Sequence, residues 1–335
     1  MEGKMDIGLS RRDFLAGTSA AAGFGGTPAL AQARTALTVM AFPGHSNLSV
    51  FSAQHKGFFA RRGLAVELKF TPNSGALREG LAKGEHHIAH AGVDNAVAMV
   101  EQAKADAVIV TGGDNGFNTI FVQPEIGSLA EIRGKTIAVD APNTAYALLL
   151  YKVLKDAGLG RGDYQVRPVG GSPERLAALR QDKNLAAAVL FPPFSFQAQE
   201  AGLKDMGPAA RVVGAYQAEG AFVMRDWAKA NGEVLVRYIA ALIEGRRWAL
   251  DPANRSEATG LLAERLRLSP EIAAKTFAVI SHPTAGMAKD AKFDLEGFRN
   301  VLKLRAEIEG QWGGIPPAPE RYFDLSYYDR ALANL

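Results

Sequence analysis

Residues 134–160 read GKTIAVDAPNTAYALLLYKVLKDAGLG, and this stretch decides the fold class. Residues 137–139 are an apolar run of the length of a buried strand. A polar turn follows, in which Asn143 or Thr144 is placed to cap a helix. In residues 146–154, leucine, valine and tyrosine then recur at the spacing of a helix that packs on a sheet. A strand that leads through a small polar loop into a helix is the unit of open α/β sheets, which bind ligands at the ends of their strands.

The same pattern recurs in two blocks, residues 35–118 and 127–218, each with polar loops at its strand ends. Alternating strands and helices predict mostly parallel sheets. The pattern is interrupted near residue 124, and residues 220–227 form an extended return before a helical C-terminal part. We therefore predict two lobes that face each other across a cleft and are joined by two crossings. Lobe 1 comprises residues 35–122 and 222–335, and lobe 2 comprises residues 123–221. A further strand is expected at 211–215.

The first residues contain a candidate targeting signal. Ser10, Arg11, Arg12, Phe14 and Leu15 occur in the order SRRDFL, which resembles a twin-arginine export signal. A weakly apolar stretch ends in a small-x-small cleavage site. Residues 1–31 are therefore interpreted as a signal peptide that is cleaved after Ala31, and the mature protein is expected in the periplasm.

Composition excludes several classes. The chain has 335 residues, a net charge of +3 and no cysteine. A charge this small and dispersed argues against nucleic acid. Without cysteine there are no disulfides, no thiolate metal sites and no nucleophilic cysteine. The sequence also has no G-x-S-x-G, P-loop or H-E-x-x-H motif and no paired-carboxylate pattern. We expect a non-enzymatic protein with no cofactor and no metal.

A family resemblance covers the mature chain. The segments KGFF-x-x-x-GL at 56–64, GVDNA at 92–96 and SLAEIRGKTIAV at 128–139 resemble the periplasmic substrate-binding proteins of ABC importers. The branch is the one that binds aliphatic sulfonates, taurine, nitrate and thiamine pyrimidine precursors. The resemblance implies a two-lobed type II periplasmic-binding-protein fold that closes on a small molecule. It also implies a permease with its ATPase as partners. The mature protein is expected to be a monomer. Two enzymes share this fold, but each uses cysteine.

Candidate ligand contacts come from the strand ends and from the resemblance. Among them His45 is the histidine favoured for ligand contact, and Asp94 has helix capping as the alternative. The candidates are Phe42, His45, Ser46, Asn47, Ser74, Asp94, Asn95, Asp114, Asn115, Asn143, Thr144, Ala145, Tyr146, Phe191 and Tyr216.

The charge of the ligand stays open. Helix N-termini favour an anion such as a sulfonate or carboxylate. Asp94, Asp114 and Asp140 at strand ends favour an amine or a protonated heterocycle, such as a thiamine pyrimidine precursor. His86, His87 and His90 are close in sequence, but no carboxylate lies at ligand spacing, so no metal site is expected. Glu101 and the arginines of 237–267 are expected on solvated helix faces.

Overall fold

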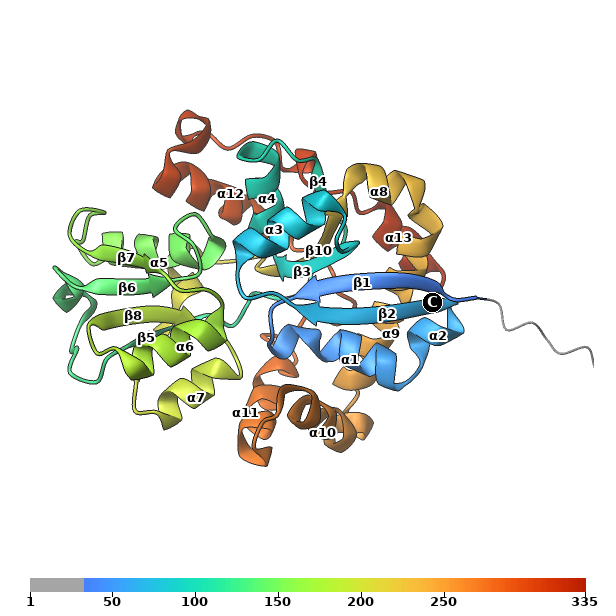
Figure 1. Ribbon diagram of the computed structural model, residues 1–335, viewed down its shortest axis with the longest axis horizontal. Helices are drawn as coiled ribbons and strands as arrows, with labels where there is room; N and C mark the ends of the chain where they lie inside the picture. Colours follow the sequence, from blue (N-terminus) through green and yellow to red (C-terminus); the bar gives the residue numbers. More distant parts are fainter. Residues whose placement is uncertain (1–32) are drawn as a thin grey trace, which may run out of the picture. The chain divides into compact units, whose positions relative to one another are not determined.

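The computed structural model describes residues 33–335, and the predicted signal segment at 1–31 lies outside the described residues. Two five-stranded sheets organise this part of the chain (Figure 1). Sheet A has the order β2-β1-β3-β10-β4. Its strands are β1 (Thr35–Ala41), β2 (Leu64–Phe70), β3 (Ile88–Gly92), β4 (Ala107–Ile109) and β10 (Glu219–Met224). In sheet A, β1 is parallel to β2 and β3, and β10 runs antiparallel to β3 and β4.

Sheet B has the order β7-β6-β8-β5-β9. Its strands are β5 (Thr119–Val122), β6 (Thr136–Val139), β7 (Gln165–Pro168), β8 (Leu185–Leu190) and β9 (Lys204–Pro208). The strand β6 is parallel to β7 and β8, and β5 runs antiparallel to β8 and β9. Each sheet is therefore mostly parallel and built from βα units, as the alternating sequence pattern predicts. One strand near an edge of each sheet runs in the opposite direction.

Helices follow most strands and cover the sheets. Those of the first part are α1 (Leu48–His55), α2 (Phe58–Arg61), α3 (Ser74–Lys83), α4 (Asp94–Glu101), α5 (Ala145–Asp156), α6 (Ser172–Gln181) and α7 (Phe194–Glu200). The C-terminal helices are α8 (Arg225–Ala230), α9 (Gly232–Leu250), α10 (Arg255–Leu266), α11 (Pro270–Ile280), α12 (Leu295–Glu309) and α13 (Ser326–Ala333). The long helix α9 packs on α1 and on α13, whereas α12 packs on α5 and α11 meets α7. The C-terminal part thus contacts helices of both sheets.

The opening βα unit has the predicted form. The strand β6 is buried along residues 137–139, and α5 buries its leucines and Val153 in a core cluster shared with sheet A residues such as Ile109. Burial of a leucine or valine side chain contributes roughly 1.5–3 kcal/mol. This apolar face holds the helix against the sheet and places its N-terminus at the end of β6.

Two expectations need correction. Residues 119–122 were assigned to lobe 1, but their strand β5 pairs with β8 and β9 in sheet B, so the chain crosses between the sheets before Thr119. The sequence of a four-residue apolar strand does not indicate which of the two sheets the strand joins. The strand expected at 211–215 is also wrong, because a 3₁₀ helix (Ala209–Val212) occupies that region and the polar edge strand β9 precedes it. The first crossing between the sheets therefore lies before Thr119, and the division into two lobes stays a prediction.

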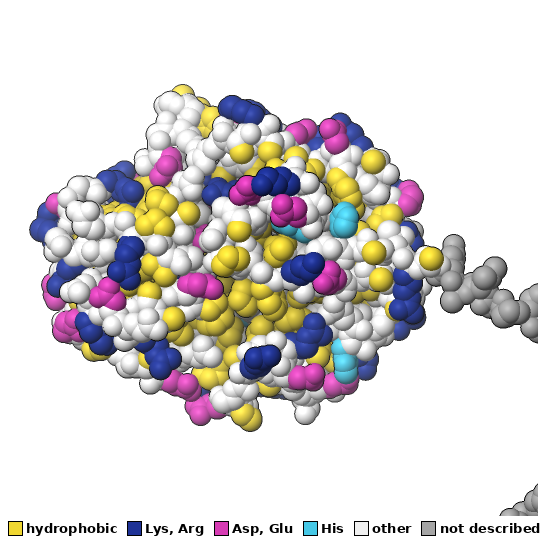
Figure 2. Space-filling model, viewed as in Figure 1, with side chains coloured by type: hydrophobic (Ala, Val, Ile, Leu, Met, Phe, Trp, Pro, Cys, Tyr) yellow, Lys and Arg dark blue, Asp and Glu magenta, His cyan; other side chains and the backbone are white. Residues whose placement is uncertain are grey.

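Apolar side chains gather where the loops of the two sheets meet, and charged side chains are scattered over the rest of the face that Figure 2 shows. No helix among residues 33–335 is long and apolar enough to span a membrane.

Candidate functional site

A cavity lies between the strand ends of the two sheets. The space between its lining atoms totals about 350 Å³, and only a small central part is wide enough for a water-sized group. It is lined by Phe42, Ser74, Gly92, Asn95 and Glu219 from the sheet A side and by Asp140, Thr144, Ala145, Tyr146, Gly171, Ser172, Arg175 and Phe191 from the sheet B side. Ligand pockets typically combine such aromatic walls with a few convergent polar groups.

Hydrogen bonds between three pairs of residues join the two sides directly around this cavity. The backbone N–H of Ser74 donates to both carboxylate oxygens of Asp140, at 3.2 and 3.3 Å. The hydroxyl of Tyr146 donates to Glu219 at 2.5 Å. The N–H of Gly171 donates to the carbonyl of Pro72 at 2.9 Å. The structure is therefore a closed arrangement in which both walls of the cavity touch.

Glu219 is the most strongly perturbed acid of the cavity. Burial, together with the charge of Asp114, raises the pKa of Glu219 to about 7, although the hydrogen bond from Tyr146 and the charge of His45 oppose the rise. Burial and the neighbouring Glu219 also raise the pKa of Tyr146, so its hydroxyl stays protonated. Near neutral pH Glu219 can hold or release a proton, and it can therefore accept from or donate to a bound molecule.

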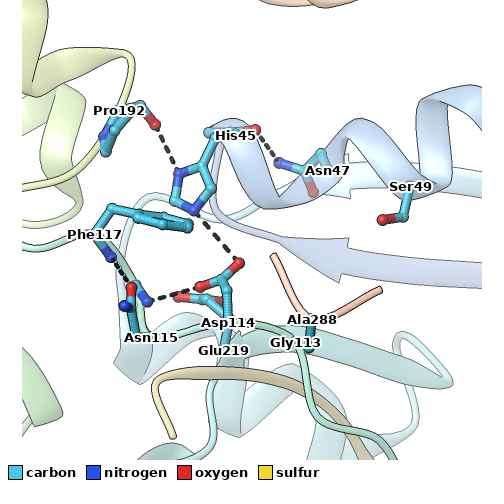
Figure 3. A network of polar contacts seen from close by, with 12 residues as sticks. His45, Asn47, Ser49, Gly113, Asp114, Asn115, Phe117, Pro192, Glu219 and Ala288 are labelled. Carbon is cyan, nitrogen blue, oxygen red and sulfur yellow. Dashed lines mark hydrogen bonds and ion pairs between the residues drawn. The ribbon is translucent and has the colours of Figure 1, made fainter. Parts of the chain in front are cut away.

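His45 and Asp114 form a buried pair at one end of the cavity (Figure 3). The Nδ1 of His45 lies 2.9 Å from the carbonyl of Pro192, and its Nε2 lies 3.5 Å from Asp114 Oδ2. Burial disfavours the charged imidazole, but Asp114 and the Pro192 carbonyl outweigh burial and raise the pKa of His45. The pKa of Asp114 is correspondingly lowered, because His45 and Arg246 outweigh its burial. Both shifts favour the pair of an imidazolium and a carboxylate, and His45 also joins the two sides.

Arg175 brings a positive charge to the cavity wall. Its side chain is 2% exposed. It donates to Gly170, Ser172 and Val189 through four hydrogen bonds. A guanidinium has five N–H donors, so one N–H stays free of these bonds. Arg175 therefore fixes the loop at the end of β7 and can still offer one donor and its charge to an anion.

The capping prediction for the turn before α5 is wrong in detail. Thr144 occupies the N-cap position, but its Oγ1 donates to the Ala141 carbonyl at 2.9 Å and makes no cap to the helix. Asn143 is turned away and donates to Gln102 at 2.6 Å. The side chains close the turn, and the first N–H groups of α5 have no side-chain cap. Such N–H groups attract anions.

The structure separates the predicted contacts into two groups. Seven line the cavity: Phe42, Ser74, Asn95, Thr144, Ala145, Tyr146 and Phe191. The other eight are absent from the lining: His45, Ser46, Asn47, Asp94, Asp114, Asn115, Asn143 and Tyr216. His45 still contacts the wall, because its ring lies edge-on to Phe191 with 5.7 Å between centroids.

Asp94 differs from both interpretations offered for it. It neither caps a helix nor lines the cavity, because both of its carboxylate oxygens accept hydrogen bonds from the buried guanidinium of Arg305. Arg246 is also buried, contrary to the expectation for the arginines of 237–267. Glu101 is likewise not simply solvated, since it accepts from Trp312 and Tyr322.

Sequence reasoning missed Glu219 and Arg175. Glu219 opens a buried apolar strand, EGAFVM, and a carboxylate at that position was the available signal. Arg175 lies in a helix rich in charges, where nothing in the sequence distinguishes it from a solvated residue.

Two of the three nearby histidines have separate hydrogen-bond partners. His87 Nδ1 accepts the N–H of Thr38 at 3.0 Å, and His90 Nε2 lies 2.8 Å from the hydroxyl of Tyr238. Burial lowers the pKa of His90 to about 3. Across residues 33–335, no group of three or more histidine, aspartate or glutamate side chains is arranged to hold a metal ion.

The model of the NMT1-like family matches residues 31–263. The chain belongs to the NMT1-like family. The search of curated protein sequences found no match to this chain.

Solved structures share its fold at low identity. The nitrate-binding protein NrtA from Synechocystis PCC 6803 superposes with a TM-score of 0.74 at 15% identity, over 90% of this chain and 89% of NrtA. The alkanesulfonate-binding protein SsuA from Xanthomonas axonopodis pv. citri, bound to MOPS, gives 0.68 at 19% identity, over 84% and 95%. The desulfurization enzyme DSZB gives 0.64 at 15% identity, over 90% and 99%. The predicted periplasmic-binding-protein fold is confirmed for this NMT1-like protein.

Proposed function

We propose that this NMT1-like protein is the periplasmic solute-binding component of an ABC import system and captures a small organic solute between its two sheets. The observation that carries the proposal is the cavity itself, which loops from the strand ends of both sheets enclose. A solute that touches both walls stabilises the closed form through its higher affinity for that form. The likeness in fold to a ligand-binding component of an ABC-type import system supports the proposed delivery to a membrane permease with its ATPase.

The favoured solute carries a sulfonate or carboxylate group. Arg175 and the uncapped N-terminus of α5 at Thr144 and Ala145 supply positive potential on one wall. Phe42, Tyr146 and Phe191 supply an apolar surface for the rest of the molecule.

A nitrogen heterocycle or an amine is the second candidate, and Glu219 is the observation that favours it. Glu219 lines the cavity, and the pKa of its carboxyl group is raised to about 7, close to neutral pH. A protonated ring nitrogen or an amine would hold it in the ionised form.

A thermal-shift panel of sulfonates, carboxylates, pyrimidines and amines tests the function. A solute at 100 times its dissociation constant stabilises the native state by about 2.7 kcal/mol. That corresponds to a rise in melting temperature of about 5–10 °C. If the whole panel, extended with extract of the native periplasm, leaves the melting temperature unchanged, solute binding is wrong. Mass spectrometry of each bound compound after incubation checks turnover, and a chemically altered compound would indicate an enzyme.

Two variants separate the solute classes. Arg175→Met should abolish the shift caused by anions and leave a shift caused by amines. Glu219→Gln should do the reverse. Circular dichroism of both variants checks that they remain folded.

Export by the twin-arginine route and cleavage after Ala31 are part of the same proposal. Replacement of Arg11 and Arg12 by lysine should leave the full-length precursor in the cytoplasmic fraction. The unchanged chain should appear in the periplasmic fraction without residues 1–31. We further propose that the mature protein is a monomer, and light scattering of the purified protein checks its mass.

A further inference from the structure

The seam between α12 and α5 joins the C-terminal helices to the sheet B side. Leu148 and Leu149 of α5 belong to the same buried cluster as Val301 and Leu302 of α12. Glu307 of α12 pairs with Lys152 and Lys155 of α5 at 3.2 and 2.9 Å, on the exposed flank of this seam.

Arg305 lies at the inner end of the seam with its side chain 0% exposed. Its guanidinium donates to both carboxylate oxygens of Asp94 and to the carbonyl oxygen of Asn143, the latter at 2.9 Å. It also donates to Gln311 at 3.4 Å. Asp94 begins α4 beside sheet A, whereas Asn143 precedes α5 beside sheet B. The Arg305 side chain therefore forms hydrogen bonds with residues of both the sheet A side and the sheet B side.

The two residues that Arg305 holds are the immediate neighbours of cavity-lining residues. Asn95 follows Asp94, and Thr144 follows Asn143; both Asn95 and Thr144 line the cavity. Because consecutive Cα atoms are about 3.8 Å apart, a shift of either held residue moves a wall of the cavity.

An ion pair between Arg305 and Asp94 alone would have a structural explanation. A buried charge needs a partner, and removal of one partner destabilises a fold whatever lies nearby. The bond to the Asn143 carbonyl satisfies one more buried N–H of the guanidinium, and unlike the ion pair it reaches the residue that precedes α5 on the sheet B side. A planar guanidinium can serve both acceptors at once.

We propose that Arg305 is a positioning residue of the solute site, which sets the spacing between the Asn95 wall and the wall formed by Thr144, Ala145 and Tyr146. This inference rests on the proposed function only in that the cavity is taken as the place where solute binds. Arg305 itself does not line the cavity.

Two variants separate positioning from stability. Arg305→Gln and Asp94→Asn both break the buried ion pair, and both should lower the melting temperature. Only Arg305→Gln removes the guanidinium that holds the Asn143 carbonyl. Amide hydrogen exchange is measured on solute-free protein by mass spectrometry. Arg305→Gln should speed exchange in residues 143–150 about tenfold more than Asp94→Asn does. Exchange in α6, which Arg305 does not touch, should rise equally in both.

A distance measurement adds a second readout. The chain has no cysteine, so spin labels attach only at introduced cysteines. Glu79→Cys on α3 and Ala177→Cys on α6 place labels at exposed positions on the two sides. Arg305→Gln should broaden the distance distribution between these labels, whereas Asp94→Asn should leave it narrow. Arg247→Gln on α9, which breaks an ion pair with Asp290, is the control and should change neither readout.

Equal exchange of residues 143–150 in the two variants, or equal distance distributions, would show that Arg305 is merely structural and overturn the proposal. If Arg305→Gln does not fold, Arg305→Lys takes its place, because an ammonium keeps the charge but lacks the fork that reaches both acceptors. Both readouts use solute-free protein. A failure here therefore leaves the import function standing, and a blank thermal-shift panel leaves the role of Arg305 intact.

Discussion

The hydroxyl of Tyr146 and the carboxyl group of Glu219 share a hydrogen bond of 2.5 Å across the cavity. Tyr146 lies in α5 on the sheet B side, and Glu219 opens β10 in sheet A. Opening of the cleft would break this bond and expose Glu219 to water. The protonation of Glu219 is therefore coupled to closure, because burial is the main cause of its raised pKa.

Glu219→Gln should remove a pH-dependent loss of stability. The pKa of Glu219 is raised from 4.5 to about 7. The folded state therefore holds its proton more tightly than the unfolded state, and stability falls as pH rises from 4.5 to about 7. The full difference corresponds to about 3 kcal/mol. Urea unfolding at pH about 4.5 and about 8 should show the variant gaining stability relative to the parent protein at the higher pH. Equal differences at both pH values would contradict the assignment.

Tyr146→Phe is the matched control for Glu219→Gln. It removes the hydrogen bond that opposes the raised pKa, and it keeps the buried ring. The loss of stability with rising pH should become larger than in the parent protein.

His45→Gln should change stability in a different pH range. The pKa of His45 is raised above 6.5, so the stability that the imidazolium contributes is fully present below pH 6.5 and is lost as pH rises through the folded-state pKa. Hydrogen bonds to a charged group contribute about 1.5–3 kcal/mol. In a Glu219→Gln background, urea unfolding should show a decline above pH 6.5 that His45→Gln abolishes. A decline that persists in the double variant would assign it to another group.

Gly44→Ala should hold the two sides apart. A Cβ at Gly44 would lie 2.6 Å from Cε2 of Phe191, which belongs to the opposite side. The Phe191 ring has little room to move, because His45, Tyr146 and Phe194 surround it. We expect a larger radius of gyration by small-angle scattering and a weaker thermal shift with any panel compound that binds the parent protein.

The control for that variant is Gly260→Ala. Nothing lies within 4 Å of a Cβ at Gly260 in α10, so scattering should be unchanged. Stability should rise by up to about 1 kcal/mol, since alanine is the better helix former. An unchanged scattering profile for Gly44→Ala would mean that the loop adapts without opening.

Local sequence patterns predict the βα units and the loops that surround the cavity. The apolar runs and the polar turns that follow them are read directly along the chain, and the parallel arrangement brings these turns together. This is why Phe42, Ser74 and Thr144, which the sequence pattern places at strand ends, line the cavity. The pairing of β5 was not predictable, because an apolar run of four residues fits either sheet.

Buried charges were the second limit. Arg305 and Arg175 lie on helices whose other charged residues are solvated, and helical periodicity does not mark which arginine finds a buried acceptor. Asp94 looked like a cap because it begins a helix, and only its partner 211 residues away changes that interpretation. Long-range pairing of polar side chains is set by the assembled fold.

Arg246→Met should destabilise the end of the cavity where His45 lies. Arg246 is 4% exposed. Its guanidinium donates to the carbonyls of Gly113 and Ala288 at 2.8 and 2.9 Å and to Ser49 Oγ at 2.9 Å. Its charge also helps to keep Asp114 ionised. Methionine would remove these three buried hydrogen bonds and the charge beside Asp114, at a cost of about 3–5 kcal/mol measured by urea unfolding. The two carbonyls would keep the N–H groups of Ala288 and Ala291 as donors.

The loss of Arg246 should also reach His45 through Asp114. Without the guanidinium the pKa of Asp114 rises, and its carboxylate holds the imidazolium less firmly. In the Glu219→Gln background, the decline of stability with pH should therefore begin at lower pH when Arg246 is replaced. Arg330→Gln, which breaks an exposed ion pair with Glu233, is the control and should cost less than about 1 kcal/mol. If Arg246→Met loses stability without moving the pH at which the decline begins, Arg246 supports only the carbonyls, and the ionisation of Asp114 depends on His45 and the Gly116 N–H alone.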